Sequence, residues 1–126
     1  MGWDVGASGF RVVLSAEVPQ MVQRHIGEDV DQFLASHGLT RRDIGSWICH
    51  TGGPKVLQAF EENLGLDEEA LALSWESLRA IGNLSSASVL FVLAATLEKR
   101  RPPVGTKGLL MAMGPGFCAE LALMEW

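Results

Sequence analysis

The chain has 126 residues, which is enough for one domain with a hydrophobic core and too few for a multidomain protein. Hydrophobic residues make up 48% and charged residues 20% of it, a globular balance that excludes a disordered chain. The net charge of −5 offers no positive field to a phosphate backbone, so nucleic acid is not an expected partner.

Strands and helices alternate along the first half of the sequence. Gly6 and Gly9 bracket a turn, and a β-branched run of strand length follows it. Proline is tolerated in a first helical turn, and apolar residues recur at helical spacing after Pro19 until Gly38. The elements predicted here are a strand over 10–14, a helix from Val18 to about His37, a capped turn over 40–43, a buried strand over 46–50 and a helix over 54–64.

The second half contains the most apolar helix and a terminal hairpin. Ser85 or Ser86 is expected to cap that helix, whose nearly continuous apolar surface predicts deep burial between layers. The elements predicted here are short helical turns at 67–69 and 74–78, the apolar helix over 87–99, a loop over 102–105, and a β-hairpin with strands over 108–113 and 117–125. This order predicts an α/β layered domain with a mixed sheet.

Neither a targeting signal nor a membrane span is visible in the sequence. The first residues lack the basic flank and apolar run of a secretory signal. The longest apolar stretch, 89–95, is far shorter than the ~20 residues that span a bilayer. Two cysteines are too few for a disulfide framework, so we expect a reduced, soluble, cytoplasmic protein without a membrane partner.

His50 is the first candidate for a functional residue. It ends a predicted buried strand, and open α/β sheets bind ligands at the carboxyl ends of their strands. Gly52 and Gly53 let the backbone approach a ligand closely, and free N–H groups of the next helix turn are suited to an oxygen of the ligand. A satisfied core or turn histidine is the alternative interpretation.

Asn83 is the second candidate. It lies in the loop before the apolar helix, where an asparagine taken alone is equally well explained as a turn former or a cap. If its amide converges with the His50 imidazole, two neutral donors meet at one point. Such a pair stabilises an oxyanion or an enolate derived from a thioester.

Neither cysteine is expected to be a nucleophile beside His50. Neighbouring side chains of a strand point to opposite faces, so Cys49 belongs to the core and cannot pair with His50. Alternation on the last strand is expected to bury Cys118 or to direct it toward a helix. His25 and His37 are expected at the surface, and no cluster has the spacing of a zinc site, so no metal is predicted.

Three segments are specific in combination, although each is weak alone: His50-Thr51-Gly52-Gly53-Pro54-Lys55, the run from Gly82 to Phe91, and Gly114-Pro115-Gly116-Phe117. In order and spacing they resemble the carboxyl-terminal domain of type III polyketide synthases, the chalcone and stilbene synthase family. The resemblance covers nearly the whole chain. The start of the chain is more similar to bacterial members than to plant members.

The resemblance implies one domain over residues 1–126, the carboxyl-terminal half of a thiolase-like αβαβα sandwich. It implies decarboxylative condensation of malonyl-CoA onto an acyl-CoA starter, with His50 and Asn83 as catalytic residues. The CoA thioesters are substrates, and no cofactor is implied. The implied partners are an amino-terminal domain that carries the nucleophilic cysteine and a second copy in a homodimer. The residues implied to contact substrate or CoA are Gly52, Gly53, Lys55, Ser85, Gly114, Pro115 and Gly116.

The sequence departs from the family pattern at three positions. Thr51 replaces the proline that usually follows the catalytic histidine, which should loosen that turn. Met113 stands where a phenylalanine often precedes the Gly-Pro-Gly loop. Val12 falls about where plant members carry a bulky phenylalanine, which implies a wider cavity.

Two other functions are compatible with parts of the sequence. β-Ketoacyl carrier-protein synthase III shares the implied fold, but it has His-Gln-Ala-Asn where this chain has His50-Thr51-Gly52-Gly53. A non-catalytic acyl-CoA-binding or dimerising module is disfavoured because both His50 and Asn83 are retained. Part of the surplus of apolar residues is expected to form a face that packs against the amino-terminal domain, so the chain alone should self-associate through that face. Without the nucleophilic cysteine of that domain, the chain alone should form no polyketide.

Overall fold

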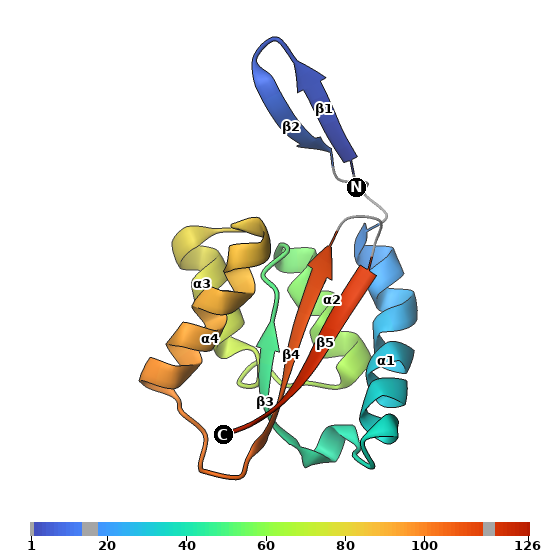
Figure 1. Cartoon of the computed structure of the whole chain (residues 1–126), viewed down its shortest axis with the longest axis vertical. Helices are drawn as coiled ribbons and strands as arrows, with labels where there is room; N and C mark the ends of the chain where they lie inside the picture. Colours follow the sequence, from blue (N-terminus) through green and yellow to red (C-terminus); the bar gives the residue numbers. More distant parts are fainter. Residues whose placement is uncertain (1, 14–17, 115–117) are drawn as a thin grey trace.

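The computed structural model describes residues 2–13, 18–114 and 118–126 (Figure 1). The strands are β1 (Gly2–Gly6), β2 (Gly9–Val13), β3 (Ile44–Cys49), β4 (Lys107–Gly114) and β5 (Cys118–Glu125). The helices are α1 (Val18–Ser36), α2 (Pro54–Leu64), α3 (Ala72–Ile81) and α4 (Ser88–Lys99), with 3-10 turns η1 (Arg41–Asp43) and η2 (Ser85–Ala87). The two predicted helices in the first half, the buried strand and the terminal hairpin are confirmed, with bounds that differ by about two residues at most.

A mixed sheet has the strand order β3-β4-β5. The parallel pair β3 and β4 sets Cys49 opposite Met111, and the antiparallel pair β4 and β5 sets Leu109 opposite Leu123. Parallel strands need a long crossover, which α2, α3 and α4 supply between β3 and β4. The predicted mixed sheet is therefore confirmed.

Helices cover this sheet on both faces, as Figure 1 shows for the α1–α2 pair and the α3–α4 pair. The residues that the sheet buries against α1 and α2 are Trp47, Cys49, Leu109 and Met111. On the other face, Ile48 packs against Val89 and Val92 of α4. β3 is thus buried on both sides, which is why its sequence is continuously apolar from Trp47 to Cys49.

The layer of α1 and α2 has a clear origin in the sequence. Its buried α1 residues recur every four positions and are at most 1% exposed: Val22, Ile26, Val30 and Leu34. Each such side chain contributes about 1.5–3 kcal/mol of transfer free energy on burial. In α2, Pro54 occupies the first turn and Gly65 ends the helix with a φ of 65°, a left-handed conformation that favours glycine.

Arg41 joins α1 to the end of α2. Its Nε and Nη2 donate to the Asp31 carboxylate at 2.6 and 2.8 Å. Its Nη1 donates to the Asn63 carbonyl at 2.7 Å and its Nη2 to the Gly27 carbonyl at 3.0 Å. One half-buried guanidinium therefore satisfies backbone acceptors in both α1 and α2.

A second, two-stranded sheet was not predicted. β1 and β2 pair antiparallel from Gly2 opposite Val13 to Gly6 opposite Gly9, and Figure 1 shows them projecting from the layers. The turn between the glycines was predicted correctly, but the strand before it was missed. An isolated two-stranded sheet is marginal in water, and this one leaves Val5 and Phe10 exposed, so its pairing alone contributes little stability.

The prediction that the apolar helix is deeply buried is wrong. In α4 only one side is buried, whereas Leu90, Phe91 and Leu97 are 59%, 50% and 40% exposed. The reason is that α4 covers β3 and β4 with one face, and no further layer lies over its outer face among the described residues.

Two smaller expectations at the ends of elements are also corrected. Ser85 and Ser86 do not cap α4, because they belong to η2 and the helix begins at Ser88, whose Oγ accepts a hydrogen bond from the Leu84 amide at 2.7 Å. Cys118 is exposed rather than buried. It is the first residue of β5, which is an edge strand of the three-stranded sheet.

Candidate active site

The candidate site lies at the carboxyl end of β3, where the strand turns into α2. His50 follows the last residue of β3, and its amide donates to the Met111 carbonyl of β4 at 2.9 Å. The strand pairing therefore fixes the backbone of this residue. The side chain is buried, since His50 is only 7% exposed.

Burial sets the charge of His50. Because removal from water disfavours the imidazolium, the pKa of His50 is lowered from its ordinary value. The ring is accordingly neutral at pH 7 and makes no hydrogen bond to any residue in the described ranges. A neutral imidazole with available nitrogens is suited to donate to a ligand oxygen.

The turn after His50 brings the backbone against the imidazole. A methyl group at Gly52 would lie 3.3 Å from Cδ2 and 3.5 Å from Nε2 of His50. Gly53 has a φ of 149°, a conformation that side chains rarely adopt, and it precedes the first residue of α2. The expected free amides of that helix turn are partly used, because the N–H groups of Val56 and Leu57 both donate to the Gly53 carbonyl.

Asn83 contacts the same turn from the loop between α3 and α4. Its Nδ2 donates to the Gly52 carbonyl at 3.2 Å. Its Oδ1 accepts from the Ser85 amide at 2.8 Å and from the Ser88 hydroxyl at 3.4 Å. The side-chain amide is therefore held at its nitrogen and at its oxygen, and one of its two N–H bonds remains available to a ligand.

The structure thus brings His50 and Asn83 to opposite sides of one residue. The Gly52 backbone lies against the imidazole and accepts a hydrogen bond from the asparagine amide. The two side chains make no hydrogen bond to each other. Both predicted residues therefore contact Gly52, and the expectation that their donors meet at one ligand atom stays a prediction.

The other predicted site residues fall into two groups. Lys55 is exposed in the first turn of α2, and Ser85 is exposed with a φ of 58° in η2. Gly114 ends β4, and a methyl group there would lie 3.2 Å from the Cys118 sulfur. Pro115 and Gly116 lie outside the described residues, as does the side chain of Val12.

Thr51 carries a feature that its sequence position did not predict. The residue is fully buried, and its Oγ1 has no hydrogen-bond partner within the part of the chain that the structure describes. A buried hydroxyl without a partner costs free energy, because water satisfied it in the unfolded chain. Threonine in place of the usual proline therefore puts an unsatisfied polar atom in the residue that directly follows the candidate histidine.

Cys49 has the environment of a non-nucleophilic residue. Cys49 is fully buried, and burial followed by the nearby Glu61 carboxylate raises the pKa of its thiol. The prediction that Cys49 is a core residue is confirmed. His25 and His37 are exposed, as predicted.

One positioning contact gave no signal in the sequence. Ser74 of α3 donates from its hydroxyl to the Cys49 carbonyl at 3.2 Å, directly before His50. The partners are distant in sequence, so no local pattern identifies the pair. The role of Ser88 is easier to recognise, because serine is common at helix starts.

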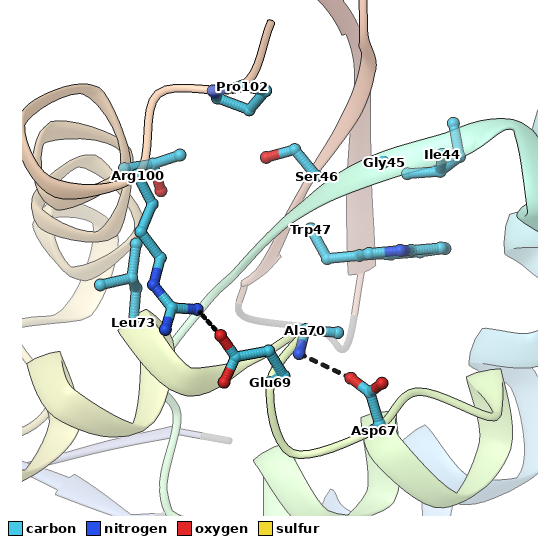
Figure 2. Close-up of a pocket in the computed structure, with 11 residues that line it drawn as sticks. Ile44, Gly45, Ser46, Trp47, Asp67, Glu69, Ala70, Leu73, Arg100 and Pro102 are labelled. Carbon is cyan, nitrogen blue, oxygen red and sulfur yellow. Dashed lines mark hydrogen bonds and ion pairs between the residues drawn. The ribbon is translucent and has the colours of Figure 1, made fainter.

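A cavity of about 330 Å³ lies at the opposite end of β3 (Figure 2). Ser46 and Trp47 line it from the strand, and the ion pair between Arg100 and Glu69, at 2.5 Å, lies along its wall. Neither His50 nor Asn83 lines it. This cavity is therefore separate from the candidate site.

The described ranges contain neither a metal-binding cluster nor a membrane-spanning helix. No three histidine, cysteine or carboxylate side chains there are grouped so that they could hold a metal ion. None of the helices described is long and apolar enough to cross a bilayer.

The sequence matches the family described as chalcone and stilbene synthases, C-terminal domain, over residues 3–125. It is 57% identical over 126 residues to 1,3,6,8-tetrahydroxynaphthalene synthase from Streptomyces peucetius subsp. caesius, covering 100% of this chain and 33% of that protein. It is 40% identical over 124 residues to 3,5-dihydroxyphenylacetyl-CoA synthase from Amycolatopsis orientalis, covering 98% of this chain and 34% of that protein. The chain spans about a third of the length of these curated relatives.

The fold is similar to that of solved type III polyketide synthase structures. The crystal structure of 1,3,6,8-tetrahydroxynaphthalene synthase from Streptomyces coelicolor A3(2), a bacterial type III polyketide synthase, matches with a TM-score of 0.91 and 32% identity. That match covers 99% of this chain and 36% of the other. The predicted α/β fold, the carboxyl-terminal half of a thiolase-like sandwich, is confirmed.

Proposed function

Because the chain belongs to the chalcone and stilbene synthase family, matching its carboxyl-terminal domain, we propose that it supplies the His50 and Asn83 part of a type III polyketide synthase active site. The reaction proposed is decarboxylative condensation of malonyl-CoA onto an acyl-CoA starter. The observation that carries the proposal is that a buried neutral imidazole and an oriented side-chain amide converge on the Gly52 backbone.

In the first proposed step, the thioester oxygen of malonyl-CoA accepts hydrogen bonds from the His50 ring and from the remaining N–H of Asn83. The bond between the α-carbon and the carboxylate then breaks, and carbon dioxide leaves. The electron pair stays on the α-carbon and the thioester oxygen as an enolate. Two fixed donors at the oxygen stabilise this charge, and removing one such donor typically costs about 10²–10³ in rate.

In the second proposed step, the enolate carbon attacks the carbonyl of an acyl group held as a thioester on a cysteine. A carbon–carbon bond forms, and the cysteine thiolate leaves. Cys49 is unsuited to this role because burial raises the pKa of its thiol. We therefore assign the nucleophile to the part of the synthase that corresponds to the other two thirds of the relatives' length.

The exposed outer face of α4 supports that assignment. Leu90 and Phe91 on α4, with Ile81 and Leu84 before it, leave an apolar surface uncovered. Such a surface suits a permanent contact with another domain. We propose that the amino-terminal domain covers it, that the complete synthase is a cytoplasmic homodimer, and that it needs no cofactor beyond its CoA thioester substrates.

Three further residues are proposed to contact substrate: Gly53 in the turn after His50, Lys55 in the first turn of α2, and Ser85 near Asn83. Lys55 is exposed beside the turn, where a cation suits the phosphates of CoA. Ser85 lies two residues after Asn83, and its amide is bound to the asparagine oxygen. Gly114, Pro115 and Gly116 are proposed to shape the cavity for the growing chain.

The test joins residues 1–126 to the amino-terminal two thirds of the Streptomyces peucetius relative and measures carbon dioxide release from malonyl-CoA together with polyketide formation. His50→Ala and Asn83→Ala should each lower decarboxylation by about 10²-fold or more, because each removes one donor from the enolate oxygen. His25→Ala is the matched control, since His25 is an exposed histidine of α1 outside the site. Unchanged decarboxylation in both site variants would instead favour a non-catalytic module.

A further inference from the structure

Glycine at position 52 is explained by the neighbouring side chains and not by its backbone conformation. Its φ lies outside the left-handed region, so alanine is compatible with the backbone at this position. A methyl group there, however, would lie 3.3 Å from Cδ2 of His50 and 3.4 Å from Cγ2 of Val56. Residue 52 therefore has to lack a side chain because the imidazole ring is close, and not because the turn needs a left-handed conformation.

The carbonyl of the same residue is engaged on its other side. It accepts a hydrogen bond from Nδ2 of Asn83 at 3.2 Å. Asn83 has little freedom to follow if Gly52 moves, because its Oδ1 is bound by the Ser85 amide and the Ser88 hydroxyl. A displacement of the Gly52 peptide thus changes the position of the imidazole relative to the asparagine amide.

We infer that Gly52 is a positioning residue: its backbone sets the separation between the His50 ring and the Asn83 amide. The inference rests on the function proposed above. It gives Gly52 a role other than the contact with substrate or CoA, through its pantetheine arm, that the resemblance implies. As a spacer, it fixes the distance between two donors that must reach one enolate oxygen, and small errors in such distances are costly in the transition state.

Gly52→Ala is the informative variant. Its methyl group forces the His50 ring or the Val56 side chain to move by a few tenths of an ångström. In the joined synthase, kcat for malonyl-CoA decarboxylation should fall about tenfold, and KM should stay within about twofold. A raised KM with unchanged kcat would show a pantetheine contact and would overturn the inference.

Gly6→Ala is the matched control. Gly6 has an ordinary φ, and a methyl group there meets nothing within 4 Å. The same glycine-to-alanine change in β1 should leave both kinetic constants unaltered. Adding Val56→Ala to Gly52→Ala gives the new methyl group room on the α2 side, so part of the lost kcat should return.

A second measurement is independent of catalysis and uses the 126-residue chain. In NMR spectra, Gly52→Ala should shift the His50 ring signals and the Asn83 side-chain amide signals together, while those of the exposed His25 stay in place. Asn83→Ala changes an exposed residue, so it is the variant to use if Gly52→Ala does not fold, and it should also shift the His50 ring signals.

The outcomes separate the two ideas. If His50 responds to Gly52→Ala while the Asn83 amide does not, or if Asn83→Ala leaves His50 unchanged, Gly52 does not link them and the inference is overturned. If the signals move together but the wild-type joined synthase releases no carbon dioxide, the positioning role holds and the proposed function fails.

Discussion

Ser74 and Ser77 lie almost one turn apart on α3 and differ in one respect. Both are buried, but the Ser74 hydroxyl donates to the Cys49 carbonyl, whereas the Ser77 Oγ has no partner among the residues described. Serine-to-alanine substitution makes the same chemical change at both positions and raises helix propensity equally. The difference between the two variants therefore isolates the hydrogen bond.

The expected free energies have opposite signs. Leaving a buried hydroxyl unpaired costs about 1–3 kcal/mol, so Ser77→Ala should raise the free energy of unfolding by about 1 kcal/mol or more. Ser74→Ala loses a hydrogen bond worth about 1 kcal/mol, partly offset by helix propensity, and should lower it by about 0.5–1 kcal/mol. The two variants should differ by about 2 kcal/mol, or about 7 °C in Tm for a chain of this length.

Urea unfolding of the 126-residue chain, followed by tryptophan fluorescence, measures both variants against the wild type. Trp75 lies between the two serines and reports on the same helix. Equal shifts of the midpoint in both variants would refute the reasoning, since the Ser77 hydroxyl would then have a partner such as an ordered water. A change in the slope m would show that the variant alters more than this one group.

Three further predictions concern the site and the helix layer. Thr51→Val keeps the side-chain shape and removes an unpaired buried hydroxyl, so thermal unfolding should show a gain of about 1 kcal/mol, and a loss would reveal a hidden partner. Arg41→Met removes the bonds to Asp31 and to two helix carbonyls and should cost about 2–3 kcal/mol in urea unfolding. Arg42→Met changes an exposed neighbour and should shift the free energy of unfolding by less than about 0.5 kcal/mol. Similar losses in the two arginine variants would show that the hydrogen bonds of Arg41 to α1 and α2 do not stabilise the fold. Because burial lowers the pKa of His50, the unfolded chain takes up the proton first as pH falls below about 6.5, so the wild type should lose stability there relative to His50→Gln. Parallel pH profiles for these two proteins would exclude a lowered pKa.

The parts of the fold that could be predicted are those with a local cause. The four-residue spacing from Val22 to Leu34 places one face of α1 in the core, and Pro54 and Gly65 mark the two ends of α2. These signals depend on neighbouring residues in the sequence and survive without tertiary information.

The errors arose where burial depends on a distant surface. The apolar residues of α4 are the same whether a further layer covers them or not, so Leu90 and Phe91 were wrongly expected inside. β1 contains two glycines and an aspartate, residue types that are depleted in strands, so its pairing with β2 is what makes it a strand. Cys118 follows the alternation rule, but alternation does not say which face of β5 is covered.

The site was found from the sequence in part. His50 was selected because it precedes a glycine-rich turn at the end of a strand, and Asn83 because it follows Gly82 in the loop before a helix. Their link through the Gly52 carbonyl is a tertiary contact and has no counterpart in local spacing. The unsatisfied Thr51 hydroxyl was equally inaccessible, because satisfaction of a polar atom depends on every neighbour in space.

The order of strands in the sheet has a consequence for synthesis of the chain. In the described ranges β3 pairs only with β4, which begins at Lys107, after three helices have been made. The strand that ends at Cys49, directly before His50, therefore leaves the ribosome with an open edge, and parallel pairing over such a separation is slow. Until β4 emerges, the apolar run Ile44–Cys49 is the segment of the nascent protein most in need of protection from aggregation. The backbone of His50 is thus fixed only after β4 has been made, because its amide donates to the Met111 carbonyl of that strand.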